Sequence, residues 1–512
     1  MRDPFAAEGN GMKIQDLLEH HGISRNPFTE EDAQTDPVFK DSCISGTHHP
    51  VWDKVFGDPR EPATAIIFGE KGSGKTAMRL QIARHLEEFN RNNDVAQLFV
   101  VHYDDFNPFL DRFRQKLGRQ GRRVERVLSQ WKLWDHMDAI LTLGLTSLVD
   151  RILDVSGPNQ HTPDVVDRSA IARLDRHQSR DLLLLAACYD QSTAETVYGR
   201  WSRLRKTLKF RSFVAWRSVA IGVVGTTILV ALLTTLAIYQ QWGWLRPVWL
   251  YVLLMLAIWT PWLWRFVKCH WLARAVTRHV RIGNRDTGTL RKILLYFADA
   301  ELSAQPLPAH DRTDDRYELL SKFQGVLAGL GHSGVVVLVD RLDEPHLING
   351  SVDLMKALLW PMLDNKFLKQ SGVGLKMMLP IELVPYIDRE EQAFFQRARL
   401  DKQNMVRSLE WTGEALYDVA NARLRACASD GATPKLTDLF DESVSEQRLI
   451  DALRTLRVPR HLFKFLYRLL VAHSTSHTEG NPVWKIPRDT FESVLAVYNR
   501  DQDAVDRGMS AG

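Results

Sequence analysis

The stretch Gly69-Glu-Lys-Gly-Ser-Gly-Lys-Thr76 decides the fold class of this 512-residue chain. It matches the pattern G-x-x-x-x-G-K-[ST] and follows Ala63-Thr-Ala-Ile-Ile-Phe68, a short apolar run typical of a buried strand. After it, the segment Ala77–Leu86 has apolar residues at roughly helical spacing. A strand, a glycine-rich loop and a helix in this order are the context in which the pattern binds phosphate, although a match also arises by chance in arbitrary loops.

The residue types of this loop suit a nucleoside triphosphate. Its glycines let backbone N–H groups turn inward around phosphates, at the positive end of the helix dipole. Lys75 would reach the β- and γ-phosphates as a catalytic residue, and the Thr76 hydroxyl would help to hold Mg²⁺. We therefore expect ATP and Mg²⁺ as cofactors, with these nucleotide-binding residues: Gly69, Glu70, Lys71, Gly72, Ser73, Gly74, Lys75 and Thr76.

A second nucleotide signature lies far downstream. Val335-Val-Val-Leu-Val339 predicts a buried parallel strand that ends at Asp340, which is the pattern of a Walker B element. Asp340 would orient the Mg²⁺ ion together with Thr76. Another strand is expected at Val95–Tyr103, and the Asp104-Asp105 pair after it either faces the nucleotide or forms a solvated turn; we favour the turn and leave the pair out of the site.

The residue after Asp340 is Arg341, which cannot act as a base, although many ATPases of the AAA+ class place a catalytic glutamate there. The candidates for polarising the attacking water are therefore Asp343 and Glu344, and we favour Glu344. The alternative is that one of these carboxylates only caps the next element.

Three further features bear on the site. The expected strand Gly374–Pro380 ends in apolar residues, so the polar γ-phosphate sensor of related ATPases is missing or displaced. Arg397 and Arg399 are either arginine fingers or part of a charged helix face. Arg460, near the start of a basic helix, either reaches the phosphates from a lid or belongs to a purely structural helix.

Two apolar segments lie between the two signatures. Ser218–Tyr239 has 22 residues and Pro247–Trp264 has 18, and neither contains a charge. At about 1.5 Å per residue, both approach the roughly 30 Å thickness of a bilayer core. The short connector Gln240–Arg246 predicts a tight transmembrane hairpin, and the alternative is a hairpin buried in a soluble protein.

The flanks of these segments are strongly basic. They contain no acidic residue, and nine of the fifteen tryptophans lie between Trp201 and Trp271. By the positive-inside rule we expect a multi-pass protein of the cell inner membrane with both termini cytoplasmic, and contacts with anionic lipid headgroups. The flanking cations are Arg200, Arg203, Arg205, Lys206, Lys209, Arg211 and Arg217 before the pair, and Arg265, Lys268, Arg274, Arg278, Arg281 and Arg285 after it.

Composition adds limits. The content of 45% hydrophobic and 25% charged residues is ordinary for a globular protein, and a net charge of +4 does not indicate nucleic acid as a partner. Four scattered cysteines suit a reducing compartment and favour neither a disulfide framework nor a structural zinc. The amino terminus has no apolar region of the kind found in cleaved signal peptides.

These observations predict an α/β fold: a P-loop NTPase with a parallel-sheet core, a large helical insert containing a two-helix transmembrane hairpin, and a helical C-terminal domain. The expected parts are an N-terminal region (1–60), the first half of the NTPase domain (61–105), a helical insert (106–212), the hairpin (213–266), a helical return segment (267–330), the second half of the NTPase domain (331–400) and a lid-like C-terminal domain (401–512).

A phosphate-binding loop and a Walker B element separated by two membrane helices resemble the KAP family of membrane-associated NTPases. The tail Asp340-Arg-Leu-Asp-Glu344 resembles that of STAND and origin-recognition-type AAA+ ATPases, because the KAP pattern usually ends in Asp-Arg. The whole is also similar to uncharacterised bacterial membrane-inserted P-loop ATPases. The resemblance implies a membrane NTPase that acts as a regulated switch or scaffold, often in stress or phage defence.

The leading hypothesis is an ATP-hydrolysing signalling ATPase that assembles at the inner membrane as a homo-oligomer with an unidentified protein partner. The alternatives are a membrane scaffold that binds nucleotide without significant turnover, and an oligomeric pore-forming effector. Two apolar helices per chain, without buried charges, make a transport path dependent on oligomerisation.

Overall fold

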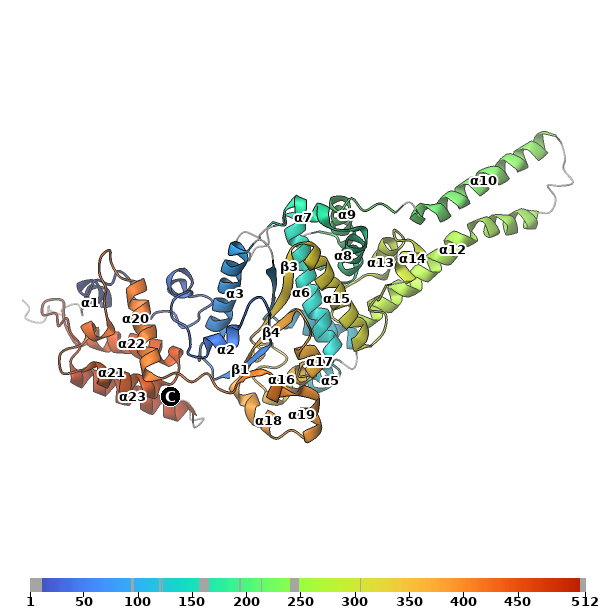
Figure 1. Cartoon of the computed structure of the whole chain (residues 1–512). Helices are drawn as coiled ribbons and strands as arrows, with labels where there is room; N and C mark the ends of the chain where they lie inside the picture. The colour runs from blue at the N-terminus through green and yellow to red at the C-terminus, as the bar shows by residue number, and fades with distance from the viewer. Residues whose placement is uncertain are drawn as a thin grey trace, which may run out of the picture.

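The computed structural model describes residues 12–93, 96–118, 121, 123–155, 165–192, 195–212, 214–239, 248–303 and 305–506. At its centre lies a five-stranded parallel sheet with the order β2-β3-β4-β1-β5 (Figure 1). The α/β class with a parallel sheet is therefore confirmed. The strands are β1 (Ala65–Gly69), β2 (Gln97–Tyr103), β3 (His332–Val339), β4 (Val373–Pro380) and β5 (Asn404–Val406).

The strands follow the sequence predictions closely, with two differences. β3 begins at His332, three residues before the expected start at Val335, and these first residues already pair with β2. The three-residue β5 is not apparent in the sequence, because it is too short to show a pattern. Helices cover both faces of the sheet, as parallel sheets require, so alternate side chains of β3 enter two different cores.

One face of the sheet is covered by α2 (Trp52–Phe56) and by α3 (Lys75–Asn92), which starts at the glycine-rich loop. Helices of the long insertion between β2 and β3 cover the other face, chiefly α6 (Leu133–Leu153) and α15 (Thr313–Gly329). The rest of the insertion comprises α4 (Asn107–Leu117), α5 (Val124–Ser129), α7 (Arg168–Arg173), α8 (Arg176–Tyr189), α9 (Val197–Thr207), α10 (Val214–Ile238), α12 (Val248–His279), α13 (Thr287–Leu294) and α14 (Asp299–Ser303).

Helices α10 and α12 are long and apolar enough to cross a membrane, and most of their surface is exposed. They project from the body on the side away from the C-terminal helices (Figure 1). The two helices contact each other at Gly222 and Gly225, and Trp259 Nε1 donates a hydrogen bond of 2.9 Å to Thr226 Oγ1. The connector expected between them, with Trp242 and Trp244, lies outside the described residues.

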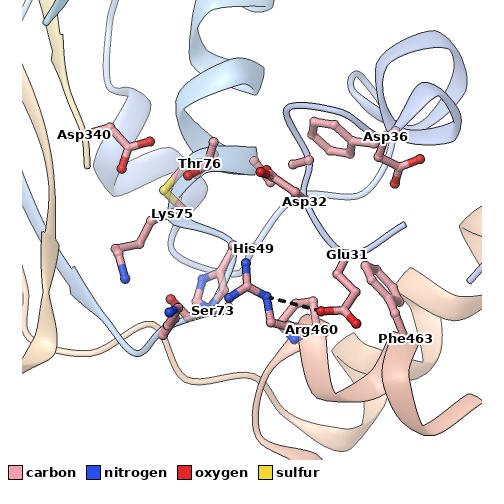
Figure 2. Close-up of a pocket in the computed structure, with 18 of the residues that line it drawn as sticks. Glu31, Asp32, Asp36, His49, Ser73, Lys75, Thr76, Asp340, Arg460 and Phe463 are labelled. Atoms are coloured by element: carbon pink, nitrogen blue, oxygen red, sulfur yellow. Dashed lines mark ion pairs between the residues drawn. The ribbon is translucent and has the colours of Figure 1, made fainter. Parts of the chain in front are cut away.

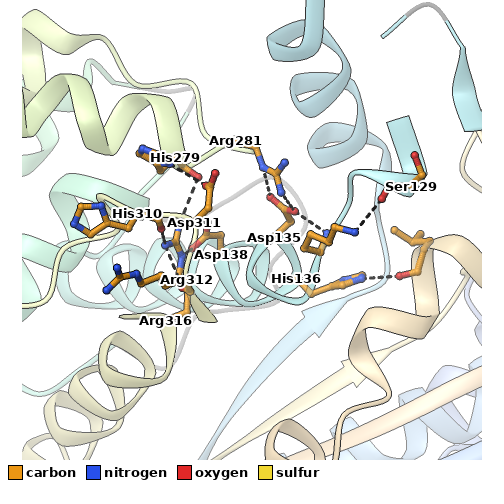
Figure 3. A network of polar contacts seen from close by, with 12 residues as sticks. Ser129, Asp135, His136, Asp138, His279, Arg281, His310, Asp311, Arg312 and Arg316 are labelled. Atoms are coloured by element: carbon orange, nitrogen blue, oxygen red, sulfur yellow. Dashed lines mark hydrogen bonds and ion pairs between the residues drawn. The ribbon is translucent and has the colours of Figure 1, made fainter. Parts of the chain in front are cut away.

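Helix α12 continues well beyond the expected end of its apolar segment, and its last turn is held in the body by a buried polar network (Figure 3). Arg281 binds Asp135 of α6 through two hydrogen bonds, and its Nε donates at 3.0 Å. Arg316 of α15 binds Asp138 of α6 at 3.1 and 3.2 Å, and also donates to the backbone carbonyl of His279 at 3.4 Å. The end of α12 is thus tied to the helix that lies on the sheet.

The cations of the basic flanks differ in exposure, and Arg205 is half-buried over the rings of Trp201 and Tyr296. Arg200 and Arg281 form ion pairs with aspartates inside the protein, and Arg265 and Arg285 donate hydrogen bonds to backbone carbonyls. These four cations therefore stabilise the fold rather than face a membrane. The flanking cations whose side chains are exposed are Arg203, Lys206, Lys209, Arg211, Arg217, Lys268, Arg274 and Arg278.

The C-terminal helices form a second core, which also includes the N-terminal region. Leu17, Leu18 and Phe28 are buried in it against residues of the last four helices. These helices are α20 (Gly413–Ala426), α21 (Glu446–Leu456), α22 (Pro459–Thr475) and α23 (Arg488–Asp506), and α1 (Ile14–His20) packs on α22. Between β3 and β5 lie α16 (Val352–Leu359), α17 (Asn365–Leu368), α18 (Val384–Asp388) and α19 (Gln392–Ala398).

Candidate functional site

The glycine-rich loop connects β1 to α3 at the carboxyl edge of the sheet. Gly72 and Gly74 have φ angles of +88° and +92°, a region that residues with a Cβ adopt only with strain. A Cβ at Gly72 would also lie 2.6 Å from the Cβ of Arg460, so the loop has no room for one. The loop conformation therefore depends on glycine at both positions and places backbone N–H groups at the start of α3.

Lys75 is the first residue of α3, and its ammonium group is folded against the loop. Its Nζ donates hydrogen bonds to the carbonyls of Gly69 at 2.6 Å and Glu70 at 2.9 Å. Burial lowers the pKa of Lys75, and attraction by Asp343, followed by Asp340 and other carboxylates, opposes that shift. The side chain is a half-buried cation surrounded by acceptors.

Asp340 follows β3 and is 2% exposed. Its Oδ1 accepts a 2.9 Å hydrogen bond from the backbone N–H of Arg341, whereas its Oδ2 accepts none from the described residues and lies 3.3 Å from Arg79 Nε. Burial raises the pKa of Asp340, and Arg79, then the nearby Thr76 hydroxyl, oppose the shift.

A buried carboxylate oxygen with accepting capacity beside a threonine hydroxyl is a donor set that suits Mg²⁺ and its bound water. Thr76 and Asp340 are the residues that would hold the ion. In the part of the chain that the structure describes, no cluster of three or more His, Cys, Asp or Glu side chains offers a different metal site.

The two carboxylates considered as bases differ in their surroundings. Glu344 is 58% exposed, and its Oε2 lies 3.5 Å from Arg341 Nη1. Burial raises the pKa of Glu344, and Arg341 opposes the shift. Asp343 is half-buried and is the carboxylate that attracts Lys75 most strongly. Both line the cavity, but Asp343 interacts more strongly with the lysine of the loop.

A cavity of about 400 Å³ opens onto these residues (Figure 2). This volume lies within the range of small-molecule sites. Its walls come from the loop and sheet edge, from residues 31–49 of the N-terminal region, and from the C-terminal helices. Figure 2 shows Asp340, Lys75 and Thr76 on one side and Phe463 on the other, so polar and apolar walls face a common space. The apolar lining includes Phe39, Met78, Val419 and Phe463.

The start of α22 and the segment before α20 contact the glycine-rich loop directly. Trp411 Nε1 donates a 2.8 Å hydrogen bond to the carbonyl of Ser73, and the Arg460 backbone N–H donates one of 3.3 Å to the carbonyl of Gly72. Arg460 lies in the first turn of α22 and faces Glu31 at 3.9 Å. The sequence indicated Arg460 as one of two possibilities, whereas nothing in it indicated the role of Trp411.

The two arginines considered as arginine fingers lie away from the cavity. Arg397 and Arg399 do not line the cavity, since Arg397 lies over the ring of Phe394 and Arg399 faces Asp401. Just beyond the end of β4, Glu382 lines the cavity and attracts Lys75.

Sequence reasoning also missed Arg79, and it left out Asp104, which is bound to Arg79. Arg79 lies three residues after Thr76, on the helix that follows the loop. The only sequence signal for it is a cation on the otherwise apolar, buried face of that helix.

Comparisons with known proteins do not assign the site. The chain matches no family model, no curated protein and no solved structure.

Proposed function

We propose that this chain is a membrane-anchored ATPase that binds MgATP through Gly69–Thr76. The single observation that supports this most directly is the convergence, on one cavity, of a glycine-rich loop at a helix start, the half-buried Lys75 and the buried Asp340. A triphosphate needs N–H donors, a cation and a metal-holding carboxylate in this arrangement. The resemblance to KAP-type NTPases extends the proposal to a signalling or regulatory role, in stress or phage defence.

Different residues of the site would bind the phosphates, hold Mg²⁺ and accept the proton of the attacking water. Loop N–H groups would bind the phosphates, and Lys75 would exchange its hydrogen bonds to loop carbonyls for bonds to phosphate oxygens. Mg²⁺ at Thr76 and Asp340 would neutralise charge on the phosphates. In hydrolysis the oxygen of a water attacks the γ-phosphorus, the bond to the ADP oxygen breaks, and Glu344 or Asp343 accepts the proton of the water.

We propose that α10 and α12 form a transmembrane hairpin in the inner membrane, with both termini cytoplasmic. The exposed cations of the flanks would bind anionic headgroups, because they lie just outside the apolar segments. A homo-oligomer is part of the proposal, since Arg397 and Arg399 lie away from the chain's own cavity and would act as fingers only on a neighbouring copy.

One observation favours the scaffold alternative, in which nucleotide binds without significant turnover. The favoured base Glu344 is largely exposed and interacts with Arg341. A base in water and beside a cation polarises a bound water less effectively than a sheltered one. The scaffold and the ATPase share the binding site and differ only in turnover.

The binding site is tested with Lys75→Ala in detergent-solubilised protein. Titration with a fluorescent ATP analogue should show saturable binding by the wild type and none by the variant at the same concentrations. Lys13→Ala is the matched control, because the side chain of Lys13 is 69% exposed, pairs with Glu479 and does not line the cavity. Equal affinity of wild type and Lys75→Ala would remove the site assignment.

A further inference from the structure

A cluster of three charged residues adjoins the proposed magnesium site and consists of Arg79, Asp104 and Asp340. Arg79 of α3 is 3% exposed, and its guanidinium lies between two carboxylates. Its Nε is 3.3 Å from Asp340 Oδ2, and its Nη1 forms an ion pair with Asp104 Oδ2. A buried arginine is costly to desolvate, so it is stable only where carboxylates satisfy it.

The two carboxylates come from neighbouring strands. β2 and β3 pair in parallel up to Tyr103 and Val339, so the next residues, Asp104 and Asp340, leave the same edge of the sheet together. The backbone N–H of Asp340 also lies 3.4 Å from the carbonyl of Tyr103. Without a cation between them, the two carboxylates would repel each other in a poorly solvated place.

The contacts of Asp340 also fix the orientation of its carboxylate. Oδ1 is held by the N–H of Arg341, and Oδ2 faces Arg79 without accepting a hydrogen bond from any described residue. Arg79 therefore holds the group by charge and leaves lone pairs of Oδ2 available. Metal ligands generally depend on such outer partners for their orientation.

We propose that Arg79 is a positioning residue that holds Asp340 for Mg²⁺, so that the gain in nucleotide affinity caused by Mg²⁺ depends on Arg79 while the affinity for metal-free nucleotide does not. The inference builds on the proposed function, because it takes Thr76 and Asp340 as the magnesium site. It concerns the metal and not the glycine-rich loop, because the guanidinium of Arg79 pairs with Asp104 and Asp340.

The test is an equilibrium titration of a fluorescent ATP analogue, in MgCl₂ and in EDTA, with the purified full-length chain. Arg79→Met removes the charge but keeps the length of the side chain. We expect its EDTA affinity to stay within about twofold of wild type, and the affinity gain from Mg²⁺ to fall about 10–100-fold, as for other outer partners of metal ligands. Arg84→Met is the matched control, because Arg84 lies on the same helix but pairs with Glu87 and Glu88 near the surface.

Two further variants distinguish a role of Arg79 in positioning Asp340 from a role in anchoring α3 to β2. Arg79→Lys keeps a cation and should recover part of the gain in nucleotide affinity caused by Mg²⁺. If Arg79→Met does not fold, the comparison of Arg79→Lys with wild type tests the positioning role. Asp104→Asn removes the other partner of Arg79 and should leave most of the Mg²⁺ effect. If Arg79 only anchors α3 to β2, Asp104→Asn and Arg79→Met will lower thermal stability alike and leave the Mg²⁺ effect unchanged.

The remaining outcomes are also decisive. An unchanged Mg²⁺ effect in Arg79→Met, or a parallel loss of affinity in MgCl₂ and in EDTA, would overturn the positioning role. Absence of nucleotide binding by the wild type in both buffers would instead refute the proposed function itself.

Discussion

Replacing Arg316 by methionine should destabilise the protein far more than an ordinary surface substitution. Arg316 and Asp138 are both fully buried, and the arginine donates two hydrogen bonds to that carboxylate. Methionine fills much of the space of the arginine but supplies no charge. Asp138 would keep only the 2.7 Å hydrogen bond from the Tyr189 hydroxyl among its side-chain partners.

The expected loss of stability follows from what happens to the Asp138 carboxylate when Arg316 is removed. Burial raises the pKa of Asp138, and Arg316 opposes that shift, so the group will take up a proton once the arginine is gone. Protonating an aspartate of ordinary pKa at pH 7 costs about 4 kcal/mol, from about 3 pH units at about 1.4 kcal/mol each. Removing one partner of a buried pair costs about 3–5 kcal/mol in general, which agrees.

Urea denaturation followed by tryptophan fluorescence measures the effect. With a slope of about 3 kcal/mol/M, the midpoint of the transition that includes α6 should fall by about 1–1.7 M. The control is Lys366→Met, because Lys366 and Asp314 form an ion pair with side chains 62% and 83% exposed, worth about 1 kcal/mol or less. If both variants shift the midpoint equally, the reasoning from burial is wrong.

Three further predictions concern the site, pH and the membrane. Glu344→Gln should reduce ATP turnover about 10²–10⁴-fold while binding persists, and a loss in Asp343→Asn but not in Glu344→Gln would identify Asp343 as the base. Burial lowers the pKa of His136 to about 4, so between about pH 6.5 and 4 the unfolded chain binds a proton that the folded chain does not. The free energy of unfolding therefore falls by about 1.4 kcal/mol for each unit by which the pH is lowered from 6.5 to 4. His136→Gln should make the pH dependence of the urea midpoint shallower in that window, and an identical slope would contradict the assignment. Replacing residues 218–264 by a flexible linker should move the protein from the membrane to the soluble fraction after centrifugation, and continued sedimentation with membranes would contradict a role of α10 and α12 as the anchor.

The sequence predicts those parts of the fold that local patterns determine. The strand before Gly69–Thr76 and the helix after it are visible because each needs only its own apolar spacing. β3 is visible because a strand buried on both faces is a continuous apolar run. Likewise, α10 and α12 are evident from length and hydropathy alone.

Contacts between distant segments are what the sequence does not reveal. Residues 12–43 pack with the C-terminal helices, and no local pattern links them. Arg79 finds its partners on β2 and β3, so its importance depends on the order of strands in the sheet. The basic flanks show the same limit, because four of their cations turn inward to partners elsewhere in the chain while eight others are exposed. For the site, residue types identify Lys75 and Asp340, but exposure distinguishes Asp343 from Glu344.

The order of strands in the sheet has a consequence for biosynthesis. β1 pairs with β4 and β5, and β2 pairs with β3. The first two strands to leave the ribosome therefore do not pair with each other. At about 5–20 residues per second, the chain between Tyr103 and His332 takes about 10–50 s to synthesise. During that interval the apolar segments α10 and α12 emerge, so they would enter a bilayer before the sheet exists. If α10 and α12 are the membrane anchor, the sheet would be completed on a chain already tethered at the membrane, with its first strands unpaired and open to chaperones until the last third of the protein arrives.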